Sequence, residues 1–137
     1  MISLSSKLEN VEEAFVNVHE YLGDHNFSLG GNWDYDHGYF DRNLDEERKV
    51  WLRLPFHVTH GTMEGESDQS DAVIKFGQPF VLKHLYNEGL DNMAEAKVVG
   101  ALVDQFQKPV DPDADVEPSW VEQAEDVLRK VEKGLLQ

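Results

Sequence analysis

The sequence contains no cysteine among its 137 residues. Without thiols the chain can form neither disulfides nor thiolate zinc sites, and it has no cysteine nucleophile. It also lacks any apolar run that approaches the roughly 18 residues of a membrane-spanning helix. The segment from Met1 to Lys7 has no basic region followed by an apolar run, so no signal peptide is predicted. These absences predict a soluble, cytoplasmic protein.

Basic residues are scarce as well, since 12 lysines and arginines stand against 27 acids and give a formal net charge of −15. Such a chain repels phosphate backbones, and its few bases form no stripe. We therefore expect neither nucleic acid nor a membrane surface among its partners. With 40% hydrophobic residues, a chain of this length can bury about two thirds of its unfolded surface around one core. We expect a single domain, residues 1–137.

Hydrophobic periodicity predicts a helix near each end of the chain, at residues 10–22 and 119–135. Asn10 is the expected cap of the first helix, and Ser119 forms a capping box with Glu122 at the start of the second. Strands are expected at residues 27–35, 39–44, 49–58, 72–76, 80–86 and 97–107. The last is assigned as a strand because of its β-branched residues and Gly100. The fold class is therefore α+β, with a single antiparallel sheet of about five or six strands and both helices packed on one face.

Residues 49–58 show the clearest pattern in the chain, because apolar residues alternate strictly with others. The apolar side, which we expect on the core, consists of Val50, Leu52, Leu54, Phe56 and Val58. The opposite side carries Trp51, Arg53 and His57. Aromatic residues and arginine together are typical of a covered protein interface. This pattern predicts a non-enzymatic interaction module that buries Trp51, Arg53 and His57 in a homodimer or against a protein partner.

A second candidate site lies in residues 29–40, which are rich in aromatic residues and glycine. A hairpin turn at His37-Gly38 would pair Tyr35 with Phe40, Asp34 with Asp41, and Trp33 with Arg42, whose side chain would stack on Trp33. Opposed carboxylates need a cation or an arginine between them. The alternative function is therefore a small-ligand- or metal-binding protein or enzyme, with its pocket formed by Trp33, Asp34, Tyr35, Asp36, His37 and Tyr39. The competing interpretation is a core hairpin whose acids point into water.

Other motifs for catalysis or metal binding fit poorly. The spacing of a calcium loop occurs at Asp111, Asp113, Asp115 and Glu122. However, Val116 stands where that loop needs glycine, and Pro118 stiffens it. His57 and His60 would lie on opposite faces of a strand, and no serine-nucleophile motif is present. We assign no catalytic residue, no cofactor and no metal ligand, and we favour a protein that is not an enzyme.

Three segments resemble the YugN-like family of small cytoplasmic proteins from Bacillus and its relatives. They are Gly-Gly-Asn-Trp-Asp-Tyr-Asp-His-Gly-Tyr-Phe-Asp (30–41), Leu-Arg-Leu-Pro-Phe (52–56) and Asp-Gln-Phe-Gln-Lys-Pro-Val-Asp-Pro-Asp-Ala (104–114). The similarity runs over nearly the whole chain, and the first motif is the most specific. The resemblance implies a single α+β domain. It implies no activity and no catalytic residue.

Overall fold

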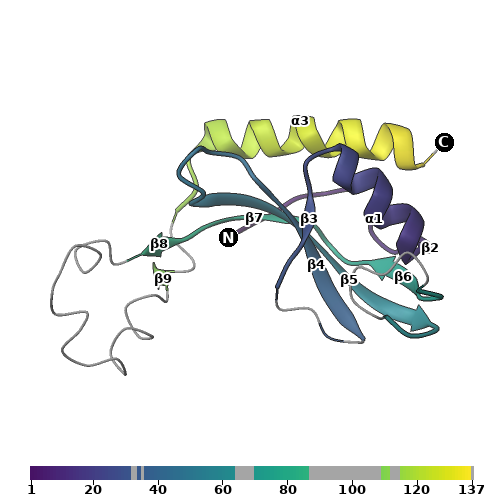
Figure 1. Ribbon diagram of the computed structural model, residues 1–137. Helices are drawn as coiled ribbons and strands as arrows, with labels where there is room; N and C mark the ends of the chain where they lie inside the picture. The colour runs from purple at the N-terminus through teal and green to yellow at the C-terminus, as the bar shows by residue number, and fades with distance from the viewer. Residues whose placement is uncertain (32–33, 35, 64–69, 87–108, 112–114, 137) are drawn as a thin grey trace, which may run out of the picture.

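The computed structural model describes residues 1–31, 34, 36–63, 70–86, 109–111 and 115–136 (Figure 1). The predicted α+β class and antiparallel sheet are confirmed, while the strand expected at 97–107 lies outside the described residues. In chain order the elements are β1 (Ile2–Ser3), β2 (Glu12–Ala14), α1 (Phe15–Asp24), β3 (Ser28–Leu29), β4 (His37–Asn43), β5 (Val50–His60), β6 (Val73–Phe76), β7 (Phe80–Lys83), β8 (Leu85–Tyr86), β9 (Pro109–Asp111) and α3 (Pro118–Leu135).

β5 is the central strand of a seven-stranded antiparallel sheet. One edge of β5 pairs with β4 from Trp51 to His57. The other edge is divided, because β7 pairs with Val50–Arg53 and β6 pairs with Phe56–His60. β3 adds to β4, β1 to β7 and β2 to β6. A separate pair of short strands is formed by β8 and β9.

The two helices among the described residues lie on the same side of the sheet, as Figure 1 shows. The alternation of β5 explains why, since Leu52 and Leu54 are fully buried on that side. The helices cover them with one apolar stripe each: Phe15, Val18 and Leu22 from α1, and Ala124, Val127, Leu128 and Val131 from α3. Phe40 of β4 belongs to the same core, with its ring centroid 4.9 Å from that of Phe56. The predicted core face of β5 and the one-sided helical cover are therefore confirmed.

The start of the first helix differs from the prediction. Residues 12–14 form β2, which pairs with β6 through Glu12 and Lys75, and the helix begins at Phe15. Asn10 does not cap the helix, because Ala14 occupies the N-cap position. Asn10 instead has a φ of 72°, in the left-handed region, and its backbone N–H donates to the Phe76 carbonyl at 2.8 Å. The spacing of apolar residues suited a longer helix, but pairing with an available sheet edge determines the conformation of this segment.

The expected capping box of the last helix is also wrong. Glu117 occupies the N-cap position, no side chain caps the helix, and Pro118 lies in its first turn. Proline favours the first helical position because its missing N–H would have no partner there in any case. Ser119 and Glu122 therefore lie inside the helix. No helix among the described residues is long and apolar enough to cross a membrane.

The predicted hairpin register at residues 33–42 is wrong as well. Asp34 pairs with His37, so the turn falls two residues earlier than the expected His37-Gly38. Farther along, β3 pairs Leu29 with Phe40, which brings two inward-facing apolar residues together. The guanidinium of Arg42 donates to the His25 carbonyl at 3.1 Å, whereas the expected stacking partner lies outside the described residues.

Candidate functional site

The side of the sheet away from the helices is called here the far face. Strand register and the alternation of side chains assign its positions. They are Ser3, Glu12, Ala14, Ser28, His37, Tyr39, Asp41, Asn43, Trp51, Arg53, Pro55, His57, Val73, Lys75, Phe80 and Leu82. Neither described helix covers this face. The structure thus brings Trp51, Arg53 and His57 to one surface, and it adds Tyr39 and Phe80 beside them.

Arg53 and Asp41 form the centre of the far face. The guanidinium of Arg53 donates two hydrogen bonds to the Asp41 carboxylate, 2.8 Å from Nε and 3.0 Å from Nη2. The Asp41 side chain is only 11% exposed, whereas that of Arg53 is 25% exposed. The same guanidinium lies 4.7 Å from the centre of the Tyr39 ring. A two-point ion pair with a cation–π contact holds the arginine in one orientation.

Hydrogen bonding places these cross-strand neighbours close together. Leu44 donates to the Val50 carbonyl and Val58 donates to the Asp36 carbonyl, each at 2.8 Å. The pairs that exchange backbone hydrogen bonds are therefore the inward-facing ones. The far-face pairs fall between them, where antiparallel strands bring side chains closest. Asp41 and Arg53 form one such pair, and the exposed residues His37 and His57 form another.

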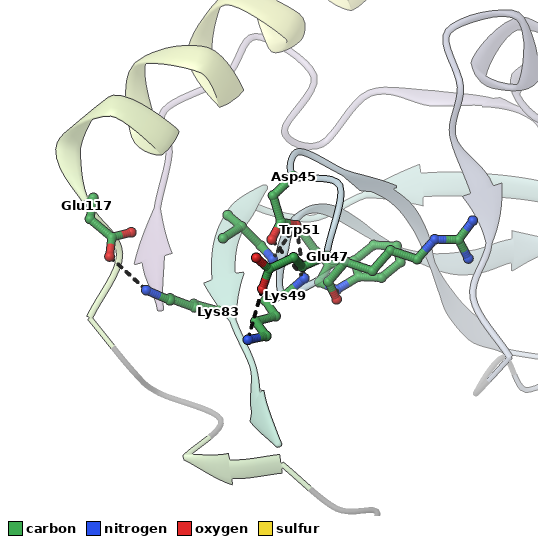
Figure 2. Close-up of polar contacts among 8 residues, drawn as sticks. Asp45, Glu47, Lys49, Trp51, Lys83 and Glu117 are labelled. Carbon is green, nitrogen blue, oxygen red and sulfur yellow. Dashed lines mark hydrogen bonds and ion pairs between the residues drawn. The ribbon is translucent and has the colours of Figure 1, made fainter. Parts of the chain in front are cut away.

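Trp51 lies at one end of the far face and is half-buried. Its indole N–H donates to the Arg48 carbonyl at 2.8 Å, so the ring is held against the turn before β5 (Figure 2). That turn is itself fixed by Asp45, whose carboxylate accepts the backbone N–H of Lys49 and of Val50, each at 2.9 Å. The indole is therefore a rigid, partly exposed aromatic surface.

Figure 2 also shows an ion pair that links the sheet to the start of the last helix. The ammonium group of Lys83 lies 2.7 Å from the Glu117 carboxylate. Lys83 points toward the helices because it alternates with Leu82, which faces the far side. The hydrogen bond from Lys83 lowers the pKa of Glu117.

β7 contributes far-face residues that the sequence alone did not single out. Register places Phe80 beside Arg53 and Leu82 beside Trp51. His84 follows at the same alternation. Burial lowers the pKa of His84, Arg53 lowers it further, and Asp41 partly offsets the decrease. The alternation of Phe80, Leu82 and His84 was visible in the sequence, but the pairing of β7 with the first half of β5 was not.

The alternative pocket is only partly described. Trp33 and Tyr35 lie outside the described residues. Asp34, Asp36 and His37 are exposed, and each offers a possible ligand atom within 4.8 Å of the other two. Nδ1 of His37 lies 2.6 Å from the Asp36 carboxylate. Tyr39 does not belong to this cluster, because it lies under Arg53 on the far face.

Comparisons with known proteins agree with one another. A model of the YugN-like family matches residues 3–135. The chain is 26% identical over 137 residues to "Uncharacterized protein YugN" from Bacillus subtilis (strain 168), with 99% of each protein covered. It also resembles the crystal structure of "uncharacterized conserved protein YugN" from Geobacillus kaustophilus HTA426, with a TM-score of 0.67. That match covers 97% of this chain and 93% of the other. Because the two sequences are only 18% identical, the match shows the fold alone.

Proposed function

The chain belongs to the YugN-like family, and from the geometry of its far face we propose that it is a non-enzymatic interaction module that forms a homodimer. The observation that carries the proposal is the rigid cluster of Arg53, Asp41, Tyr39 and Trp51 on a sheet face that neither described helix covers. Arginine, tyrosine and tryptophan are the residues that contribute most often to binding energy at protein interfaces.

Preorganisation supports the same proposal. Binding costs less entropy when interface side chains are already fixed. Arg53 has both its carboxylate and its aromatic contact within the single chain, and the Trp51 indole has its hydrogen bond. A second copy would therefore meet a surface that needs little rearrangement.

Charge favours a second copy as the occupant. The whole chain carries −15, so most pairs of surfaces from two copies repel each other. On the far face, the two acids Asp41 and Glu12 are matched by the two bases Arg53 and Lys75. A balanced surface on an otherwise acidic chain permits self-association without the cost of like charges.

If two copies meet through the far face, the size of that face predicts a weak dimer. The stretch from Trp51 to His57 is about 20 Å long and five paired strands are about 24 Å wide, which gives roughly 500 Å² per copy. Two copies would bury about 1,000 Å², near the lower limit for a specific interface. We expect dissociation in the micromolar range.

The experiment is static light scattering over a concentration series for the native protein and Trp51→Glu. The native protein should approach twice the mass of one chain at high concentration, while Trp51→Glu should remain a monomer. Leu136→Glu is the matched control, because it also places an acid at a partly exposed apolar residue, 38% exposed and off the far face. A native monomer throughout the series would remove the proposal, as would equal effects of both substitutions. Binding of a different protein to the far face, without self-association, would also contradict it.

One observation favours a second function, the binding of a divalent cation at the turn before β4. Two carboxylates and an imidazole, from Asp34, Asp36 and His37, lie within 4.8 Å of one another. Carboxylate and imidazole together suit zinc or manganese better than calcium. A cation that binds only the native state must raise the melting temperature.

Thermal unfolding with zinc, manganese or calcium chloride tests this second function. The melting temperature should rise in the native protein and stay unchanged in His37→Gln and Asp34→Asn. His60→Gln is the control, because His60 is exposed and lies outside the cluster. If no cation changes the melting temperature, or if His37→Gln and Asp34→Asn respond like the native protein, the site does not bind metal.

A further inference from the structure

A cleft of about 370 Å³ lies between the N-terminal segment and the end of α3. It is remote from the far face, because α3 packs on the opposite side of the sheet. Its lining residues are Lys7, Arg129, Glu132, Lys133 and Leu136. Binding sites for small molecules usually occupy about 300 to 1,000 Å³, so this cleft suits a small ligand.

A buried carboxylate holds the floor of the cleft in place. One oxygen of Glu132, Oε2, accepts hydrogen bonds from the Ser6 hydroxyl at 2.6 Å, the Lys7 backbone N–H at 3.0 Å and Arg129 Nη1 at 2.6 Å. Nη2 of Arg129 donates to the Ser5 carbonyl at 2.9 Å. The N-terminal segment and α3 are thereby fixed to each other, and the Arg129 guanidinium is held at the cleft.

The charge of the cleft is opposite to that of the chain. Three of the chain's 12 bases line it with a single acid. That acid, Glu132, already pairs with Arg129, which leaves the two lysines. Within the described part of the chain, the side chains of Lys7 and Lys133 make no ion pair with any carboxylate. On an acidic protein, the described residues that line this cleft thus carry an excess of two positive charges.

We propose that this cleft binds a small organic phosphate. A phosphate monoester carries a charge of about −1.5 to −2 at neutral pH, which matches the two available lysines. The Arg129 side chain is 48% exposed, so its outer edge can add a further donor to phosphate oxygens. Leu136 is 38% exposed and provides an apolar surface for the organic part. The ligand would contact both the N-terminal segment and α3.

A purely structural role for these bases makes a different prediction. Positive side chains at a helix C-terminus stabilise the helix through its dipole, and Lys133 lies in the last turn of α3. In that case, neutralising Lys133 would lower the melting temperature equally with and without phosphate. If the cleft binds phosphate, neutralising Lys133 should instead reduce the rise in melting temperature that added phosphate causes.

The experiment is thermal unfolding and isothermal titration calorimetry of the full chain with inorganic phosphate and with phenyl phosphate, against sodium chloride at equal ionic strength. Both phosphates should raise the melting temperature, and phenyl phosphate should bind more tightly because of its apolar ring. Lys7→Gln and Lys133→Gln should each weaken binding about tenfold, as expected for the loss of one charge-assisted hydrogen bond. These substitutions leave the Glu132 hydrogen bonds intact.

Lys130→Gln is the matched control, since Lys130 is exposed on the same helix but does not line the cleft. It should bind phosphate like the native protein. The proposal is overturned if neither phosphate exceeds chloride at equal ionic strength. It is also overturned if Lys130→Gln weakens binding as much as Lys133→Gln, because the effect would then reflect overall charge.

Discussion

Arg53 and Asp41 lie directly opposite each other on β5 and β4, and the guanidinium meets the carboxylate through two hydrogen bonds of 2.8 and 3.0 Å. The carboxylate is nearly buried on a face that neither described helix covers. This ion pair balances the charge of the far face and fixes the arginine over Tyr39.

The first prediction concerns this ion pair. Arg53→Met should lower the free energy of unfolding by about 2 kcal/mol, because it leaves the Asp41 carboxylate nearly buried without its cation. The loss should be smaller than for a fully buried pair, since Arg53 is one quarter exposed. Urea unfolding measures it. The double variant Arg53→Met with Asp41→Asn should lose less than the sum of the two single losses, and strict additivity would show that the pair does not interact.

The second prediction concerns pH and His84. Its pKa lies below the ordinary value of 6.5 because of burial, with a further decrease from Arg53 that Asp41 partly offsets. The unfolded chain therefore binds the proton more readily than the folded one, and the free energy of unfolding should fall as the pH drops below about 6.5 toward the folded pKa. His84→Gln should flatten this dependence in urea unfolding. His60→Gln, which changes an exposed histidine, should keep it. Equal slopes in both variants would contradict the assignment.

The third prediction concerns Glu132. Burial raises its pKa, but hydrogen bonds from Ser6, Arg129 and the Lys7 backbone outweigh burial, so the pKa lies below the ordinary 4.5. Glu132→Gln should cost about 2 kcal/mol at pH 7, the value of hydrogen bonds to a charged group. The difference from the native protein should shrink as the pH falls below 4.5 and through the folded pKa. Glu125→Gln, at an exposed position of the same helix, should change stability by less than about 0.5 kcal/mol. A constant loss at every pH would show that the charge is not involved.

The fourth prediction compares two helical glycines. A methyl group at Gly134 would collide with the Tyr21 ring and hydroxyl, and that hydroxyl donates to the Val131 carbonyl at 3.0 Å. Gly134→Ala should therefore destabilise the protein by about 1 to 2 kcal/mol. Gly23→Ala meets no atom within 4 Å and should stabilise it by up to about 1 kcal/mol through helix propensity. Melting temperatures that move in the same direction would contradict the packing of Tyr21 against α3.

The hydrophobic pattern of the sequence predicted correctly those elements that have one apolar and one polar face. Strict alternation fixed which side of β5 lies on the core, and Leu52 and Leu54 are buried as expected. The hydrophobic pattern gave a wrong prediction where a helix and a strand fit the sequence equally well. The spacing of Val11, Ala14 and Phe15 suits a helix, yet strand pairing with β6 takes residues 12–14.

Long-range pairing explains what the sequence did not reveal of the candidate site. Glycine at position 38 suggested a turn, but the turn falls earlier, and the pairing of Leu29 with Phe40 places Phe40 on the core. The predicted partner of Asp41 was another acid, whereas the structure supplies Arg53. The cleft between the N-terminal segment and α3 joins residues more than 120 positions apart in the chain, a proximity that no local pattern encodes.

Labels at two positions distinguish whether two copies meet through the far face. Because the chain has no cysteine, one introduced cysteine gives a unique position for a nitroxide label. Ser28→Cys places the label at the edge of the far face, and Ser119→Cys places it on α3. Both serines are exposed, so the two variants are closely matched.

Pulsed electron paramagnetic resonance of each singly labelled protein, at concentrations where light scattering detects the dimer, measures the distance between labels on different copies. We expect a defined intermolecular distance for the label at residue 28, and this distance should be shorter than that for the label at residue 119. A shorter distance at residue 119, or no intermolecular coupling at either position, would contradict dimerisation through the far face.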